Sequence, residues 1–279
     1  MAGTITHQFI AFKLKEKYQE LDSSYLLFSS SGPDIFNYLD KSLAKRMHQK
    51  ETALFLKELI KKTDFNKKKE LSILVGAFSH FIADSILHPY IYYLGGRYLS
   101  TKETEKYKYK HEIIETSIDN YFIDKFKYSF GFISSFKPFK TYLEVVNKVY
   151  GCHISLKDYK KAYLKRKIYY NLFRLNKGLK YYFYSSLLRK RLILDKRLKS
   201  EEYLNLGRNT WYHPVTKEKR EESFLELIDQ VLIRIEEGLD KIFKYYETHD
   251  ESYLDFIENK SYLTGEIINK ENKLVYFKE

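Results

Sequence analysis

The longest apolar stretch of the chain, Ile73 to Tyr93, predicts one helix that is apolar on nearly all sides and therefore belongs at the centre of a fold. Within it, His80, Asp84 and His88 follow one another at steps of four residues. At 3.6 residues per turn they form one stripe along the helix. A buried carboxylate between two buried imidazoles is costly unless a cation neutralises it. Two sources of that cation stay open, a basic side chain of another helix or a metal ion.

The remaining hydrophobic pattern is also mostly helical. A first helix, capped by Thr4 or Thr6, is expected to run to about Glu20. Residues 29–33, Ser-Ser-Ser-Gly-Pro, predict a tight turn, and Asp34 follows it directly, so that it points inward or caps a short helix. Further helices are expected at about 49–62, 111–126, 139–150, 156–173, 178–194 and 223–246.

Three other segments are not expected to be helical. Residues 97–110 are polar and rich in Lys and Tyr, which is typical of a mobile loop over a site. Residues 205–219 contain Gly, Trp and Pro and predict an ordered loop, and residues 274–277 a short strand or an extended arm.

A second polar stripe lies in the helix expected at 111–126. His111, Glu115 and Asp119 again follow at steps of four, and the remaining apolar positions form a packing side. A lone His-x-x-x-Asp is often an ordinary hydrogen bond. Two such helices in one chain favour a metal site, because a fully satisfied buried polar network is rare and demanding.

Composition narrows the fold class. The chain has 279 residues with 27 Tyr and 20 Phe, but only 11 Gly and 4 Pro. Few breakers and many helix formers favour an all-α fold. No repeat or low-complexity linker divides the sequence, so we expect a single multi-helix bundle over residues 1–279 with a central buried helix that carries metal ligands. Its metal-site half would span about 1–130 and its helical C-terminal half about 131–279.

The net charge of +12 has two interpretations, an anionic partner or a Lys-rich codon bias, and both stay open. Lys and Arg are spread along the chain rather than striped, so a nucleic-acid partner is not favoured. Met1 to Ile10 lacks the pattern of a signal peptide, and no eighteen apolar residues run uninterrupted, so a cytoplasmic location is expected. Peripheral docking on a membrane face stays open.

The histidines and the single cysteine narrow the chemistry. Cys152 is the single cysteine, so an intrachain disulfide is excluded. Metal ligands must therefore come from His, Asp and Glu, a set that suits catalytic zinc better than a structural zinc finger. Five of the eight histidines precede residue 112, and each of them either has an acid nearby or opens a helix. The other three are expected to be surface or loop histidines: His153, His213 and His249.

Taken together, five short motifs resemble the zinc-dependent phospholipases C of bacteria and the N-terminal domain of glycosylphosphatidylinositol-specific phospholipase D. The motifs cover about residues 4–120 and are Thr6-His7, Gly32-Pro33-Asp34, His48, His80-x-x-x-Asp84-x-x-x-His88-Pro89-Tyr90 and His111-x-x-x-Glu115. The resemblance implies an α-helical bundle around a cluster of two to three zinc ions. It assigns one ion to Asp34, His48, His80 and Asp84, a second to His88, His111 and Glu115, and a third to His7 with Asp84 bridging.

The sequence departs from the family pattern at two points. Secreted members hold the third ion with the amine and carbonyl of an N-terminal Trp, whereas Met1 or Ala2 stands here, so the third site is expected to be weak or vacant. The step from Asp84 to His88 is shorter than in the secreted lecithinases and is like that of the phospholipase D relative.

The implied activity is that of a metal-dependent phosphodiester hydrolase, phospholipase C-like, in which zinc-bound hydroxide attacks the substrate phosphorus. Asp34 is the expected catalytic residue, because it could orient or deprotonate the attacking water, and Asp119 is expected to orient His111 or Glu115. The substrate would be a phospholipid or another phosphodiester. Two alternatives stay open: a catalytically inactive, metal-stabilised helical protein, and a phosphodiesterase or nuclease acting on a non-lipid substrate.

Overall fold

The computed structural model describes residues 3–96, 110–126, 136–137, 139–174 and 200–268. These residues are predominantly helical, which confirms the all-α fold class. Among them, one two-stranded antiparallel sheet pairs β1 (Trp211–Tyr212) with β2 (Lys219–Arg220). That hairpin lies inside the segment expected to be an ordered loop.

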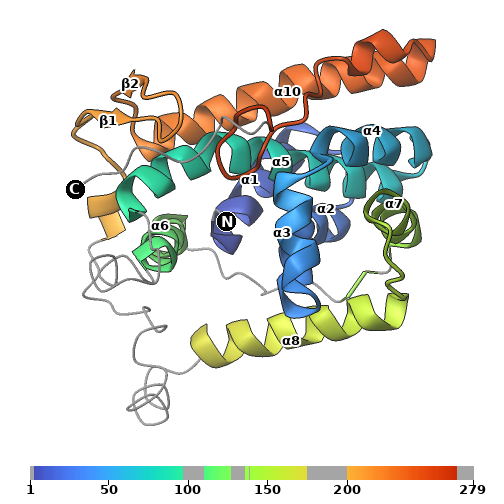
Figure 1. The fold of residues 1–279 in the computed structure, drawn as a ribbon, viewed down its shortest axis with the longest axis horizontal. Coiled ribbons are helices and arrows are strands. Elements are labelled where there is room, and N and C mark those ends of the chain that lie inside the picture. The colour runs from blue at the N-terminus through green and yellow to red at the C-terminus, as the bar shows by residue number, and fades with distance from the viewer. Residues whose placement is uncertain (1–2, 97–109, 127–135, 138, 175–199, 269–279) are drawn as a thin grey trace.

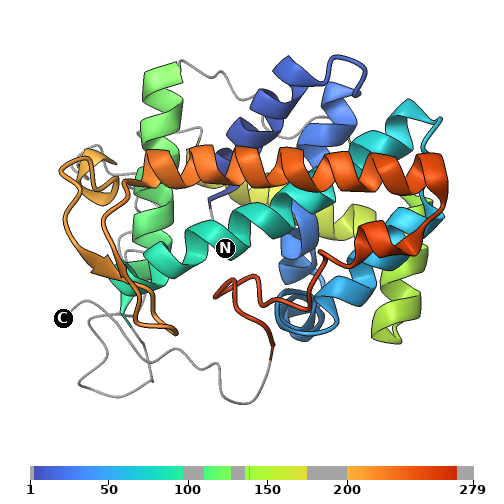
Figure 2. The same cartoon turned by 90° about the horizontal axis from the view of Figure 1, so that it is seen from above.

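The central helix is α5 (Lys68–Gly95), and its buried side chains lie on all of its sides. It packs against helices from both halves of the chain, and α10 runs alongside it (Figures 1 and 2). These neighbours are α1 (Thr4–Lys17), α2 (Ser23–Ser29), α6 (Lys110–Phe126) and α10 (Phe224–Thr248). By length and composition α5 could cross a membrane, but 83% of its most apolar window is buried inside the protein, as expected for a core helix.

Between α2 and α5 the chain forms η1 (Gly32–Tyr38), α3 (Lys41–Gln49) and α4 (Thr52–Lys62). The helix expected at about 49–62 is found as α4 and begins three residues later, after Glu51, which adopts a left-handed conformation with φ of 54°. The helix α3 before it was not predicted. His48 therefore lies in the last turn of α3, not before the first turn of α4. The side chain of Asp40 begins α3 by accepting hydrogen bonds from the backbone amides of Ser42 and Leu43.

The other expected helices are found where the structure describes them. They are α7 (Lys140–Tyr150), α8 (Leu156–Arg174) and α10. The first helix begins after Gly3 rather than after a threonine cap, and ends at Lys17. The helix expected at 178–194, the arm at 274–277 and nearly all of the loop at 97–110 lie outside the described residues.

The C-terminal half completes the core. After η3 (Ser200–Tyr203) and the β-hairpin, α10 begins with a capping box in which Ser223 and Glu226 exchange hydrogen bonds. Beyond η4 (Glu251–Leu254) the chain folds back toward the middle of α5 (Figure 2). Buried apolar residues from Ile5 to Tyr262 form one continuous cluster, so both halves share a core.

Candidate metal centre

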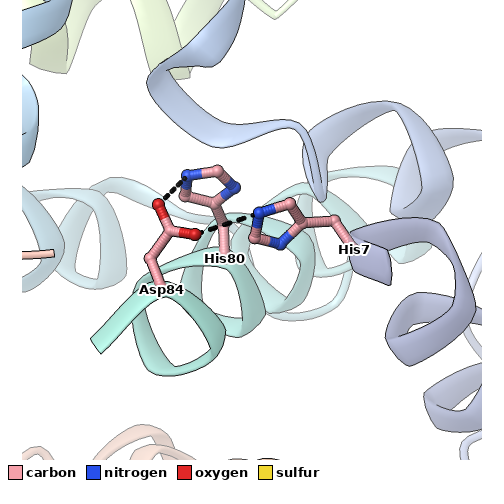
Figure 3. Close-up of side chains that lie close together, drawn as sticks. All are labelled: His7, His80 and Asp84. Carbon is pink, nitrogen blue, oxygen red and sulfur yellow. Dashed lines mark ion pairs between the residues drawn. The ribbon is translucent and has the colours of Figure 1, made fainter. Parts of the chain in front are cut away.

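The polar stripe of α5 is buried in the middle of the protein. His80, Asp84 and His88 have no solvent-exposed surface. One carboxylate oxygen of Asp84 lies 3.1 Å from Nε2 of His7 in the first turn of α1, and the other lies 3.2 Å from Nε2 of His80 (Figure 3). The rings of His7 and His80 stack with centroids 4.2 Å apart. Asp84 thus joins two helices through its two oxygens.

A second set of ligand atoms reaches the same carboxylate from η1 and α3. Nε2 of His48 lies 3.2 Å from Oδ1 of Asp34 and 3.8 Å from Oδ2 of Asp84. Oδ1 of Asp34 is in turn 3.9 Å from Nε2 of His80. The break between α3 and α4 does not displace His48, because its position is set by the last turn of α3. The four residues that resemblance assigned to one ion are therefore neighbours in space.

The third set lies between α5 and α6. Oε1 of Glu115 is 2.7 Å from Nε2 of His111 and 3.8 Å from Nε2 of His88. The side chains of His111 and Glu115 are 26% and 15% exposed, whereas the ligands around Asp84 are buried. The predicted stripe of α6 therefore meets the stripe of α5, and this group is the more accessible to solvent.

Three of the imidazoles have their protonation fixed by backbone carbonyls. Nδ1 of His48 lies 2.6 Å from the carbonyl of Ala44, and Nδ1 of His80 lies 2.9 Å from that of Ser30. Nδ1 of His88 lies 2.7 Å from the carbonyl of Tyr262. Because a carbonyl can only accept, each Nδ1 donates a proton, and Nε2 is left as the atom that directs its lone pair toward the carboxylates when the ring binds a metal. This is the usual arrangement of histidines that bind a metal through Nε2.

Three Nε2 atoms of the site are polar, buried and lack a hydrogen bond. This holds for His7, His80 and His88 among the described residues. A buried polar atom without a partner costs about 1–3 kcal/mol. The cost is higher where lone pairs of nitrogen and of carboxylate oxygen face each other. A divalent cation removes this cost, and neutral imidazole with carboxylate is a donor set that suits zinc. The residues present therefore fit zinc. They form three groups, and within each group the ligand atoms lie within 4.8 Å of one another. The groups are His7 with His80 and Asp84, Asp34 with His48 and His80, and His88 with His111 and Glu115.

The electrostatics keep the carboxylates in the ionised form that binds metal. Burial alone would raise the pKa of Asp84, but its interactions with the side chains of His88, His80 and His7 outweigh burial and hold its pKa well below the usual range. Burial lowers the pKa of His88, which keeps that imidazole neutral.

Asp34 and Glu115 follow the same logic. Burial opposes ionisation of Asp34, yet the neighbouring His80 and His48 lower its pKa. Burial likewise opposes ionisation of Glu115, but its surroundings, including the side chains of His111 and His88, hold its pKa well below the usual range. All three carboxylates of the centre are thus ionised at neutral pH.

Asp119 is buried, and its hydrogen bonds reach the start of another helix. Its carboxylate accepts hydrogen bonds from the amides of Ile5 (3.1 Å) and Thr6 (2.9 Å), and from the Thr6 hydroxyl (3.0 Å). It therefore caps the first turn of α1 and orients the helix that carries His7. The expected role beside His111 or Glu115 stays a prediction. Its spacing placed it on the correct face of α6, but the partner on that face comes from another helix.

Two features of the site were not singled out from the sequence. Gly32, with φ of +45°, lies so close to the His80 ring that a Cβ there would be 2.5 Å from Cγ and Cδ2 of His80. The turn at Gly32-Pro33 was predicted, but not its contact with a ligand. Tyr262, whose carbonyl holds His88, is 174 residues away from it in the chain and carries no local signal.

The three remaining histidines lie away from these groups. His153 and His249 are exposed, as expected. His213 lies in a loop but is only 4% exposed, so it is a buried loop histidine. Nε2 of His213 lies 3.1 Å from the carbonyl of Thr264, and its Nδ1 accepts from the amides of Val215 and Thr216. Its role is to hold loops together.

Fold and site together define an all-helical protein with a buried centre of histidine and carboxylate ligands. The family model described as zinc dependent phospholipase C matches residues 4–182, which include every ligand residue named above. The chain belongs to this family. No curated protein and no solved structure gives a significant match.

Proposed function

We propose that this protein is a zinc-dependent phosphodiester hydrolase of the phospholipase C type. The observation that carries the proposal is that five separate elements bring ionised carboxylates and imidazole Nε2 atoms together in three neighbouring groups, in a chain of this family. Zinc bound there would lower the pKa of a water molecule to about 7 and offset charge on a phosphate. The ligands would be His7, Asp34, His48, His80, Asp84, His88, His111 and Glu115.

In this proposal Asp34 is the catalytic carboxylate. It is ionised and 4% exposed, and its Oδ1 faces Nε2 of both His48 and His80, so it can orient a water molecule or accept its proton. Glu115 and His111 border the more accessible group, where substrate phosphate would enter. Asp84 also adjoins the group that contains His88, since its Oδ1 lies 3.6 Å from Nδ1 of His88 one turn along α5.

The test is hydrolysis of p-nitrophenyl phosphorylcholine and of phosphatidylcholine by the zinc-loaded protein. We expect turnover that a chelator abolishes and zinc restores. Asp34→Asn should lower kcat by about 10²- to 10⁴-fold, the usual range for an acid–base group. The exposed His153→Ala is the matched control and should keep full activity. If zinc is bound but neither substrate is turned over, a metal-stabilised protein without this activity is the better account.

The substrate class has one competitor. Turnover of bis-p-nitrophenyl phosphate or of single-stranded nucleic acid, without turnover of phosphatidylcholine, would favour a phosphodiesterase with a non-lipid substrate. We favour a phospholipid because the chain belongs to a phospholipase family.

We also propose that the whole chain, 1–279, is one domain, and that it meets a membrane through α8. The single hydrophobic cluster supports the first statement. The second rests on the outer face of α8, where exposed lysines stand beside exposed Leu164 and Ile168, with Asp158 the only acid in the helix. Basic residues beside apolar ones suit the surface of an anionic bilayer. The exposed lysines of this face are Lys157, Lys160, Lys161 and Lys165.

Vesicle sedimentation tests this contact. We expect binding to vesicles of phosphatidylcholine with phosphatidylglycerol that Lys161→Glu/Lys165→Glu weakens. Lys241→Glu/Lys244→Glu makes the same charge change on α10, on the opposite side of the protein (Figure 1), and should bind as the wild type does. Equal loss in both variants would mean that net charge, and not α8, causes the binding.

A further inference from the structure

The segment after η4 lies beyond the family match at 4–182, yet it reaches the metal centre. We call residues 258–268 the C-terminal strap. The strap folds back over the middle of α5 (Figures 1 and 2). Its Tyr262 is 2% exposed, and the Tyr262 ring packs against His48 and His80, with centroids 5.4 Å and 5.9 Å away. This aromatic ring covers one side of the ligand cluster.

The backbone of Tyr262 contacts two of the ligand-bearing helices. Its carbonyl accepts from Nδ1 of His88 at 2.7 Å, and its amide donates to the carbonyl of His48 at 2.9 Å. One residue of the strap therefore fixes the protonation and orientation of His88 in α5, and also holds the end of α3 at His48. These contacts come from the backbone, so almost any side chain at position 262 could make them.

The strap is itself held at both ends. The hydroxyl of Thr52, at the start of α4, donates to the carbonyl of Lys260 at 2.7 Å. The carbonyl of Thr264 accepts from the buried His213. Between these points the strap is closed by hydrogen bonds from the amide of Gly265 to the carbonyl of Ser261 and from the amide of Ser261 to the carbonyl of Glu266. A segment anchored in this way can hold a ligand in one orientation.

Gly265 packs the strap against α5 at the carbonyl of Ser85, which Pro89 leaves without its usual helical hydrogen bond. Proline has no N–H, so Pro89 cannot donate to the carbonyl of Ser85, four residues earlier in the helix. Gly265, with φ of +71°, packs on that carbonyl, and a Cβ at this position would lie 2.3 Å from the oxygen. Ser85 directly follows Asp84. A glycine is needed here both for the backbone conformation and for the close approach.

We propose that the C-terminal strap is a positioning element of the metal centre. By holding His88 in its Nδ1–H form it directs Nε2 toward Glu115 and His111, and its tyrosine ring excludes water from the side of His48 and His80. The inference rests on the proposed function, because it assumes that these residues bind zinc. Partners that orient a metal-binding histidine typically contribute about 10- to 100-fold to metal affinity.

The experiment compares Gly265→Ala with Gly151→Ala in the full chain. Both glycines have left-handed backbone, with φ of +71° and +61°, but a Cβ at Gly151 meets no atom within 4 Å. Zinc dissociation constants are measured by competition with a chromophoric chelator, and the melting temperature is measured with and without zinc. We expect Gly265→Ala to weaken one class of zinc site about 10- to 100-fold and Gly151→Ala to leave all sites unchanged.

A purely structural strap gives a different result. Gly265→Ala would then lower the melting temperature of the zinc-free protein while the zinc dissociation constants stay at the wild-type values, and this outcome overturns the inference. If Gly265→Ala does not fold, Thr52→Val decides by the same measurement, because it removes one anchor of the strap and keeps the side-chain shape. A wild-type protein that binds no zinc contradicts the proposed function itself, which is a separate failure.

Discussion

Replacing Gly32 with alanine tests whether the turn before Asp34 sets the position of a metal ligand. The new Cβ would lie 2.5 Å from Cγ and Cδ2 of His80, whereas ordinary contacts begin at 3.4 Å, so the ring must move by about 1 Å. The hydrogen bond from Nδ1 of His80 to the carbonyl of Ser30, at 2.9 Å, opposes that movement. Zinc–ligand distances tolerate about 0.2 Å, so the shift should remove His80 from any zinc site.

The magnitude has two parts. A non-glycine residue with φ of +45° costs about 1–2 kcal/mol, and overpacking a buried site costs about 1–3 kcal/mol. We therefore expect Gly32→Ala to lower the free energy of unfolding by about 2–5 kcal/mol. Gly151→Ala should lose only the backbone part, because nothing lies within 4 Å of its Cβ.

The assay is urea unfolding of both variants and the wild type, with zinc content measured on the same samples. Gly32→Ala should contain less zinc than Gly151→Ala and should gain less stability when zinc is added. Equal destabilisation and equal zinc content in the two variants would refute the role assigned to the contact between Gly32 and His80.

Three further outcomes are expected. Asp119→Ala removes three hydrogen bonds from the start of α1 and should lower the free energy of unfolding, measured in urea, by about 2–4 kcal/mol. Asp119→Asn keeps an acceptor oxygen and should lower it less, and equal losses in the two variants would contradict the capping role of Asp119. Burial lowers the pKa of His213 to about 4. The folded state thus binds fewer protons than the unfolded chain, and stability should fall by about 1.4 kcal/mol per pH unit from about pH 6.5 to 4, a slope that His213→Gln should lack. Zinc at a thousand times its dissociation constant should add about 4 kcal/mol and raise Tm by about 8 °C, and an unchanged Tm after chelation would oppose zinc binding.

The candidate ligands could be proposed from the sequence because most of their signal is local. His80, Asp84 and His88 lie on one helix, and so do His111 and Glu115, so a spacing of four fixes each stripe without knowledge of the tertiary structure. The apolar surroundings of the first stripe also predicted its burial, which the structure confirms.

The features that the sequence did not predict depend on a neighbouring helix or on a single backbone conformation. Glu51 separates α3 from α4 with a left-handed conformation that no helical periodicity reveals. The hydrogen bonds from Asp119 to the start of α1 join residues more than 110 positions apart, so the sequence did not predict them. The burial of His213 is a tertiary effect, because its contact at Thr264 lies 51 residues away.

The C-terminal strap shows the same limit most clearly. Nothing near Tyr262 in the sequence resembles a metal motif, and its contact with His88 uses only a backbone carbonyl. Every residue has such a carbonyl, so sequence alone cannot distinguish this one.

The central claim is that divalent cations hold the buried acids and imidazoles together, and elemental analysis of the purified protein tests it most directly. We predict about two to three zinc ions per wild-type chain, matching the three groups of ligand atoms, and fewer in Asp84→Asn, which loses the carboxylate in contact with His7, His48 and His80. Equal metal content in the two proteins, or none in the wild type after zinc has been supplied, would contradict the claim.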